Sequence, residues 1–313
     1  MKGLELARLY YEKYGKPMLE AEFPELLPHI AVGLVGAGSE CLGFDDGVSH
    51  DHDFEPGFCI FLPDEETVDR AAAFRLERAY HALPDELAGF RRARRAPTGG
   101  ARHGVLRLAE FVTEKTGTPD GLPDARDFFF IPEQSLLELT GGEIFYDGNG
   151  AFTALRARHA YLPEDVRRKK LAGELLLAGQ AGQYNYPRMM ERHDNAAGQL
   201  CIIEFVKSCL HIFCLLNKVY LPYYKWQFRT AARLPLLSEL VPTLEWLITT
   251  PNDEENVQRK QEDITKISTH LTGALQRQAL SQKHGMALED HAYAVNDRIE
   301  SGAIRNLHIL YGV

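Results

Sequence analysis

The chain has 313 residues, of which 45% are hydrophobic and 25% charged, the composition of an ordinary soluble globular protein. This length allows two domains, because single cores seldom grow beyond about 250 residues. The formal net charge of −9 argues against a dedicated nucleic-acid binder, since binding to phosphate backbones depends on a surplus of lysine and arginine.

The cysteines and the apolar segments indicate the compartment. None of the five cysteines forms a CxxC pair, which favours reduced thiols in a cytosol. The opening MKGLELARLYYEKYGKPML lacks the apolar stretch of a signal peptide. The most apolar segment, residues 200–216, contains Glu204, Lys207 and His211, which are costly at the centre of a bilayer. We therefore expect a cytoplasmic protein with no membrane partner, and a buried helix over this segment.

Hydrophobic periodicity predicts the elements of the first 160 residues. A helix is expected over residues 4–14, and HIAVGLVGAG (29–38) predicts a strand that ends in glycines. HDHDFEPGFCIFLP (50–63) predicts one or two strands, and residues 64–83 predict a helix that starts near Asp64 or Glu65. GVLRLAEF (104–111) and GEIFYD (142–147) predict further strands, with a core segment leading into a helix over 128–139.

The pattern changes from Leu162 onward, where alanine and leucine recur at helical spacing. Within this part, PNDEENVQRKQED (251–263) is the most polar stretch and predicts a mobile loop. The sequence therefore predicts an α+β fold of two domains. Residues 1–160 would form a mixed sheet with flanking helices, and residues 161–313 an all-α helical bundle.

One segment between the first two predicted strands concentrates glycine and aspartate. Asp51 and Asp53 are two residues apart, so the period of a strand puts both carboxylates on one face, where they could hold a divalent metal. Gly38 and Ser39 end the preceding strand, and a glycine-rich turn can offer N–H groups and a hydroxyl to a triphosphate. The alternative is an acidic, glycine-rich surface loop.

The spacing of these glycine, serine and aspartate residues is similar to a known family signature. A strand, Gly-Ser, a short connection and then Asp-x-Asp resembles the signature of the nucleotidyltransferase superfamily related to DNA polymerase β. GSECLGFDDGVSHDHDF (38–54) resembles the form of this signature in a bacterial family, DUF4037. Three more segments are similar to that family: GGEIFYDGNG (141–150), GQYNYPR (182–188) and NKVYLPYYKWQF (217–228).

The resemblance implies a nucleotidyltransferase-like first domain and a Mg²⁺-dependent transfer of a nucleoside monophosphate from a nucleoside triphosphate to a hydroxyl acceptor. Asp51 and Asp53 would be catalytic and would hold two Mg²⁺ ions, and Gly38 and Ser39 would bind the phosphates. The superfamily adds a third carboxylate on a later strand. Glu110 is the first candidate, and Asp127 and Asp147 are alternatives.

Other residues near these motifs leave alternatives open. Lys225 is expected to reach the phosphates, because a lysine among buried aromatic side chains needs an anionic partner. Asp45 and Asp46 would either cap and form the turn or contact substrate. The stripe of Glu204, Lys207 and His211 with Ser208 would be either an exposed helix face or part of the site.

The expected acceptor is a small molecule, by analogy with aminoglycoside and lincosamide resistance enzymes. One alternative is a catalytically inactive, nucleotide-binding regulatory protein, since no mid-strand third carboxylate is found. Another is nucleotidyl transfer to protein or RNA, for which the basic run RRARR (91–95) is the sequence support.

Overall fold

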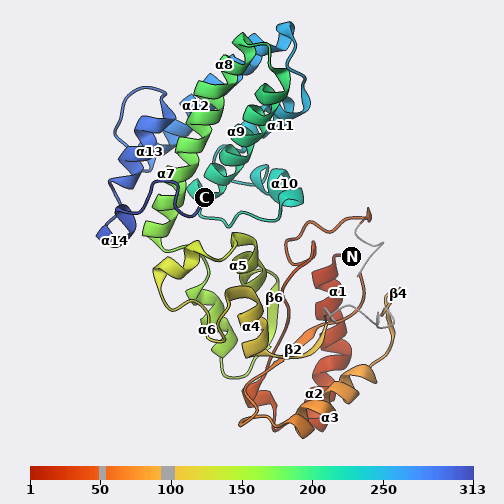
Figure 1. Ribbon diagram of the computed structural model, residues 1–313. Helices are drawn as coiled ribbons and strands as arrows, with labels where there is room; N and C mark the ends of the chain where they lie inside the picture. Colours follow the sequence, from red (N-terminus) through yellow and green to blue (C-terminus); the bar gives the residue numbers. More distant parts are fainter. Residues whose placement is uncertain (49–53, 93–102) are drawn as a thin grey trace. The chain divides into compact units, whose positions relative to one another are not determined.

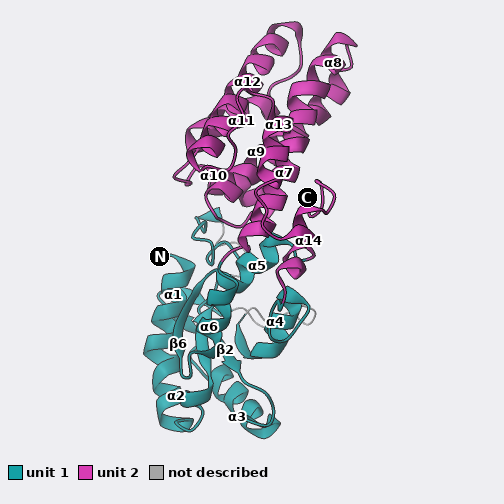
Figure 2. Ribbon diagram, turned by 90° about the vertical axis from the view of Figure 1, so that its left-hand side faces the viewer, with its two compact units in different colours: residues 1–123, 131–160 teal, residues 124–130, 161–313 magenta. Residues whose placement is uncertain are grey.

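The computed structural model describes residues 1–48, 54–92 and 103–313 (Figure 1). The chain forms two compact units. Unit 1 comprises Met1–Pro123 and Ile131–Ala160, and unit 2 comprises Asp124–Phe130 and Tyr161–Val313 (Figure 2). Unit 1 combines a small mixed sheet with helices, and the elements of unit 2 are helical, so the predicted α+β class is confirmed.

Unit 1 is built on a four-stranded sheet with the strand order β5-β2-β1-β6. Its strands are β1 (Ala31–Leu34), β2 (Cys59–Leu62), β5 (Gly104–Arg107) and β6 (Glu143–Asp147). β1 is antiparallel to both β2 and β6, whereas β2 and β5 are parallel. A separate hairpin joins β3 (Glu86–Leu87) to β4 (Phe90–Arg91).

Helices cover both faces of this sheet, because alternate strand residues point to opposite sides. Val32 and Ile60 pack into one core with α1 (Gly3–Tyr10), α2 (Lys16–Glu22) and α3 (Arg70–His81). Ala31 and Phe61 pack into the other core with α4 (Leu108–Thr116), α5 (Glu133–Thr140) and α6 (Ala151–Arg158). Unit 1 therefore has three layers, with the sheet in the middle.

Several predicted boundaries shift. The first helix continues past residue 14, because a π-helical turn (Tyr11–Gly15) joins α1 to α2. α3 begins at Arg70 rather than near Asp64, since the Asp69 carboxylate accepts a hydrogen bond from the amide of Ala72 and caps the helix. The strand predicted over 104–111 ends at Arg107, where α4 follows.

Unit 2 is built around α9 (Asn195–Leu216), which packs against α7, α8 and α11. The other helices of this unit are α7 (Glu164–Ala178), α8 (Tyr186–Glu191), α10 (Gln227–Ala231), α11 (Val241–Thr249), α12 (Glu254–Arg277), α13 (Leu288–Asn296) and α14 (Gly302–Arg305). A π-helical segment (Gly179–Asn185) joins α7 to α8, and a 3₁₀ segment (Ala125–Phe129) also belongs to unit 2.

Two segments of unit 2 test the sequence predictions. By length and composition α9 could cross a membrane, but 67% of its apolar window is buried inside the protein, as in the core helix of a soluble protein. The predicted mobile loop over 251–263 is wrong for most of its length, because α12 begins at Glu254, capped by the Asp253 carboxylate. Most polar residues there lie on the exposed side of an amphipathic helix, whereas Lys260 is buried.

Candidate functional site

One end of the unit 1 sheet gathers the groups on which a site can be built. β1 ends at Leu34, which lies opposite Glu143 at the start of β6, and the preceding Gly33 lies opposite Cys59 at the start of β2. β5 is parallel to β2 and starts at Gly104, also opposite Cys59. The carboxyl end of β1 therefore lies beside the amino ends of β2, β5 and β6. We call this the site end of the sheet.

The turn after β1 offers hydrogen-bond donors at the site end. Gly36 and Gly38 have φ angles of +107° and +131°, which glycine adopts without strain. Among the described residues, no hydrogen bond is found for the amides of Gly38 and Ser39 or for the Ser39 hydroxyl. Both residues are half-buried, so their donors can be reached by a ligand from solvent. Successive free amides in such a turn can bind an anion.

The remainder of the turn is held in place by backbone contacts. The Ser39 carbonyl accepts a hydrogen bond of 2.8 Å from the amide of Phe44, and the Cys41 carbonyl accepts one of 3.0 Å from the amide of Gly142. Arg156 donates to the carbonyl of Gly142 and to those of the preceding residues. Burial lowers the pKa of Arg156. The donors of Gly38 and Ser39 are thus presented by a fixed backbone.

Asp45 ties the end of this turn to α1. Its buried carboxylate accepts a 2.7 Å hydrogen bond from the amide of Gly3 and lies 3.4 Å from the Lys2 ammonium. A carboxylate at this position also interacts favourably with the positive end of the helix dipole. Asp46 accepts a hydrogen bond of 3.1 Å from the amide of Val48. Of the two alternatives for Asp45 and Asp46, the structure supports capping and turn formation.

Glu55 and His103 form a pair at the site end that the sequence reasoning missed. His103, directly before β5, places Nδ1 3.3 Å from Oε1 of Glu55. The side chains of His103 and Glu55 are 8% and 22% exposed, so solvent screens their interaction only partly. The signal was in the sequence, because Asp51, Asp53 and Glu55 alternate with the period of a strand.

The predicted metal ligands Asp51 and Asp53 lie outside the described residues. Within the ranges 1–48, 54–92 and 103–313, no group of three or more His, Cys, Asp and Glu side chains is arranged to hold a metal ion. A magnesium site at this end of the sheet would therefore depend on Asp51 and Asp53, with Glu55 as a nearby oxygen donor. Their role as ligands of Mg²⁺ stays a prediction.

The candidates for a third carboxylate lie elsewhere. Glu110 is exposed in the first turn of α4, and α4 follows the carboxyl end of β5. Because β5 is parallel to β2, this is the end of the sheet opposite the site end. Asp147 pairs with Ala31 at the same far end, and Asp127 belongs to unit 2. The placement counts against Glu110 and Asp147 as partners of the predicted metal ligands.

Lys225 lies on the surface of unit 2, in a 3₁₀ turn (Tyr224–Trp226). Its ammonium group is 5.0 Å from the centre of the Trp226 ring. Of the neighbouring aromatic side chains, most of which were expected to be buried, Tyr220 is buried but Tyr223 and Tyr224 are exposed. The burial argument for an anionic partner was therefore wrong, but Lys225 is accessible to a phosphate group from solvent.

The polar stripe of α9 divides into two parts. Glu204 and Lys207 form an ion pair of 3.2 Å on the outer face, whereas His211 is buried with Nδ1 2.7 Å from Oε1 of Glu174 on α7. The buried Ser208 hydroxyl has no hydrogen-bond partner in the part of the chain that the structure describes. The stripe is thus an exposed face at Glu204 and Lys207 and an internal polar contact at His211.

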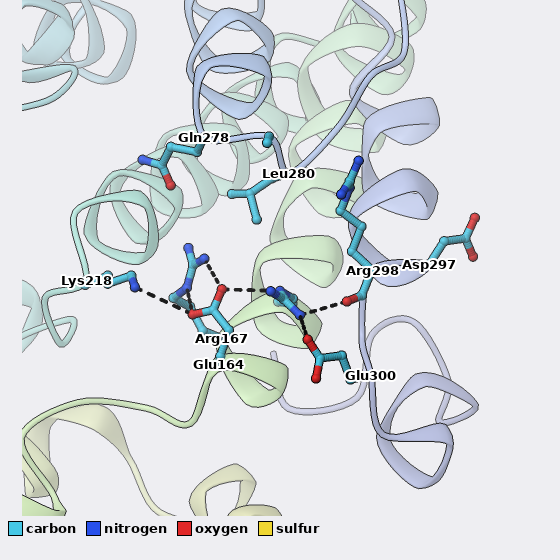
Figure 3. A pocket seen from close by; sticks show the side chains of 10 residues that line it. Glu164, Arg167, Lys218, Gln278, Leu280, Asp297, Arg298 and Glu300 are labelled. Carbon is cyan, nitrogen blue, oxygen red and sulfur yellow. Dashed lines mark hydrogen bonds and ion pairs between the residues drawn. The ribbon is translucent and has the colours of Figure 1, made fainter.

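Unit 2 also contains a pocket of about 740 Å³ lined by charged side chains (Figure 3). Arg167 binds both carboxylate oxygens of Glu164 at 2.6 and 2.9 Å, Arg168 lies 3.2 Å from the same carboxylate, and Lys218 lies 3.8 Å from it. The hydrogen bond from Arg167, followed by the charges of Arg167, Lys218 and Arg168, lowers the pKa of Glu164. These charges largely compensate one another, so we assign the pocket a structural role.

Comparison with known proteins gives one finding. The model of a family described as a domain of unknown function (DUF4037) matches residues 128–227. This range includes residues 141–150 and 182–188, and all but the last residue of 217–228, which supports the resemblance to this family over that part of the chain. The Gly38–Phe54 segment lies outside the match. No curated protein and no solved structure matches the chain.

Proposed function

We propose that this chain is a Mg²⁺-dependent nucleotidyltransferase, which moves a nucleoside monophosphate from a nucleoside triphosphate to a hydroxyl group of a small molecule. The main support is the set of free donors on Gly38 and Ser39 at the site end of the sheet. These donors lie at the same end as the start of β2, the strand that the Asp51–Asp53 segment precedes. A turn that binds phosphate oxygens, followed along the chain by a cation site, would suit a nucleotide.

The residues of the proposed nucleotide site would have different roles. The amides of Gly38 and Ser39 and the Ser39 hydroxyl would hold the terminal phosphates. Magnesium bound at Asp51 and Asp53 would neutralise the transferring phosphoryl group. Glu55, oriented by His103 at 3.3 Å, would position the acceptor hydroxyl.

The transfer itself is a substitution at phosphorus. The acceptor oxygen forms a bond to the α-phosphorus, the bond from that phosphorus to the bridging oxygen breaks, and pyrophosphate leaves with the bond electrons. The hydroxyl proton passes to water. The products are a nucleotidylated acceptor and pyrophosphate, so pyrophosphate release reports the reaction.

A second candidate is a nucleotide-binding regulatory protein without turnover. The observation that favours it is the start of β5, where neither His103 before the strand nor the residues from Gly104 to Leu106 supply a carboxylate. Such a protein would bind the nucleotide through the same turn but release no pyrophosphate. Transfer to protein or RNA would differ from the first proposal in the acceptor alone.

The first test is calorimetric titration of each of the four nucleoside triphosphates, with and without Mg²⁺, into the native protein and the Asp51→Ala/Asp53→Ala variant. We expect Mg²⁺-dependent binding by the native protein and its loss in the variant. The matched control is Glu65→Ala/Glu66→Ala, which removes two exposed carboxylates at the start of a different connection and should bind like the native protein.

The outcomes separate the candidates. If the native protein binds no triphosphate, both the enzyme and the regulatory protein are excluded. If binding occurs, pyrophosphate release is measured with hydroxylated small molecules as acceptors, and Glu55→Gln is expected to reduce the rate at least tenfold, which is about 1.4 kcal/mol of transition-state stabilisation. Binding without release in any acceptor mixture would favour the regulatory protein.

A further inference from the structure

The segment between α9 and α10 displays an aromatic and cationic surface on unit 2. Its residues are Tyr223, Tyr224, Lys225, Trp226 and Arg229, and we call it the tyrosine platform. Tyr223 and Tyr224 are 41% and 70% exposed, and their ring centres are 4.3 Å apart. Contiguous exposed apolar side chains can mark a binding surface.

Two cationic side chains accompany these rings. The Lys225 ammonium lies 5.0 Å and the Arg229 guanidinium 5.1 Å from the centre of the Trp226 ring. The turn that carries them is held by hydrogen bonds from the Trp226 amide to the Tyr223 carbonyl at 2.9 Å and from the Gln227 side chain to the Pro222 carbonyl at 3.3 Å. The platform is therefore a shaped surface and not a frayed loop.

We infer that the tyrosine platform binds a free nucleotide, with the base stacked on Tyr224 and a phosphate held by Lys225. Every base has a flat face, and stacking on an aromatic side chain contributes about 1–3 kcal/mol per base. A lysine beside the rings supplies the charge that a phosphate requires. The choice of a nucleotide over other phosphorylated rings rests on the proposed function, and the platform would be a nucleotide-binding surface of unit 2 itself.

The chain contains a matched control for this surface. Tyr184 is 58% exposed, and the Arg188 guanidinium lies 4.6 Å from its ring centre. This pair also combines an exposed tyrosine with a cation in unit 2, but it lacks the second tyrosine and the second cation of the platform. If exposure of a tyrosine beside an arginine were sufficient, Tyr184 would bind nucleotides equally well.

The platform carries its own reporter, because the chain has two tryptophans and Trp226 belongs to the platform. In a Trp246→Phe background, Trp226 fluorescence is titrated with each nucleoside triphosphate in EDTA, so that no metal-dependent site contributes. We expect saturable quenching that weakens at least tenfold in Tyr224→Ala and persists in Tyr224→Phe, which keeps the ring. Lys225→Ala should weaken binding and reduce its dependence on salt, and Tyr184→Ala should change nothing.

Different results would contradict the inference about the platform and the proposed function. Absent quenching, or quenching that survives Tyr224→Ala unchanged, would overturn the inference. A single-stranded RNA oligomer that binds the platform more tightly than any mononucleotide would overturn the assignment of a free nucleotide in favour of RNA. Magnesium-dependent binding in calorimetry without Trp226 quenching would leave the proposed function standing and the platform refuted. Quenching in EDTA without magnesium-dependent binding would support the platform and refute the proposed function.

Discussion

Lys260 illustrates how much a single buried side chain can influence stability in this protein. Its side chain is fully buried, and its ammonium group donates to the Asn252 side-chain oxygen at 2.8 Å and to the Thr250 carbonyl at 2.5 Å. Tyr186 donates to the same Asn252 oxygen at 3.1 Å. Hydrogen bonds to neutral oxygens compensate only part of the hydration free energy that a buried ammonium group loses. Burial accordingly lowers the pKa of Lys260 to about 8.

This pKa predicts a rise in stability with pH. Below about pH 8 both the folded and unfolded states hold the proton, and the folded state carries the full cost of burying the charge. Between that pH and about 10.4, the unperturbed pKa of lysine, the folded state has released the proton while the unfolded state retains it. The free energy of unfolding therefore increases across this window.

The measurement is urea denaturation at several pH values across the window, for the native protein, Lys260→Met and Lys266→Met. Lys266 is exposed on the same helix and serves as the control. The rise should be smaller in Lys260→Met and unchanged in Lys266→Met. Equal slopes in all three proteins would contradict the assignment of the effect to Lys260.

At the scale of elements, Gly33 determines how β6 pairs with β1. The register between these strands shifts between Val32 and Gly33, and a Cβ atom on Gly33 would lie far inside the contact distance of the Glu143 carbonyl oxygen and 3.0 Å from the Ile144 Cα. The close approach of the two backbones thus depends on the absence of a side chain. It also fixes Glu143 beside the turn at the site end.

Gly33→Ala is expected to destabilise the protein by about 1–3 kcal/mol, the usual cost of inserting a group into a packed region. The control is Gly47→Ala, because a Cβ there meets no atom within 4 Å, and its effect should stay within about 0.5 kcal/mol. Chemical denaturation measures both. A Gly33→Ala variant as stable as Gly47→Ala would show that β6 can move away from β1 without cost.

At the scale of the whole molecule, the chain has two compact units with separate buried cores. Phe152 is fully buried in unit 1 against the sheet, and Phe205 is fully buried in unit 2 against the π-helical segment that follows α7. Units with their own cores can unfold separately, in which case a single free energy of unfolding does not describe the chain.

We therefore expect two transitions in differential scanning calorimetry of the intact chain. Phe152→Ala should lower one transition and Phe205→Ala the other, each by the equivalent of about 3–5 kcal/mol. A nucleoside triphosphate with Mg²⁺, at about 100 times its dissociation constant, should stabilise the unit 1 transition by about 2.7 kcal/mol. If each substitution lowers both transitions together, the two units unfold as one.

Features that depend on local pattern could be predicted from the amino-acid sequence alone. Apolar spacing fixed the α+β class, the strand at Ala31–Leu34 and the helical second part, because a period of two or of 3.6 residues is a property of neighbouring positions. Gly36 and Gly38 after β1 could likewise be recognised, since a turn with positive φ favours glycine locally.

Features that depend on distant partners became visible only in the folded chain. The parallel pairing of β5 with β2 brings His103 to the site end and leaves Glu110 at the opposite end, and no local pattern states which strands are neighbours. The exposure of Tyr223 and Tyr224 could not be predicted from the sequence either. Hydrophobic composition favours burial but does not say whether another element covers the ring. Pairing and coverage are properties of the folded chain, and they set which residues can act together.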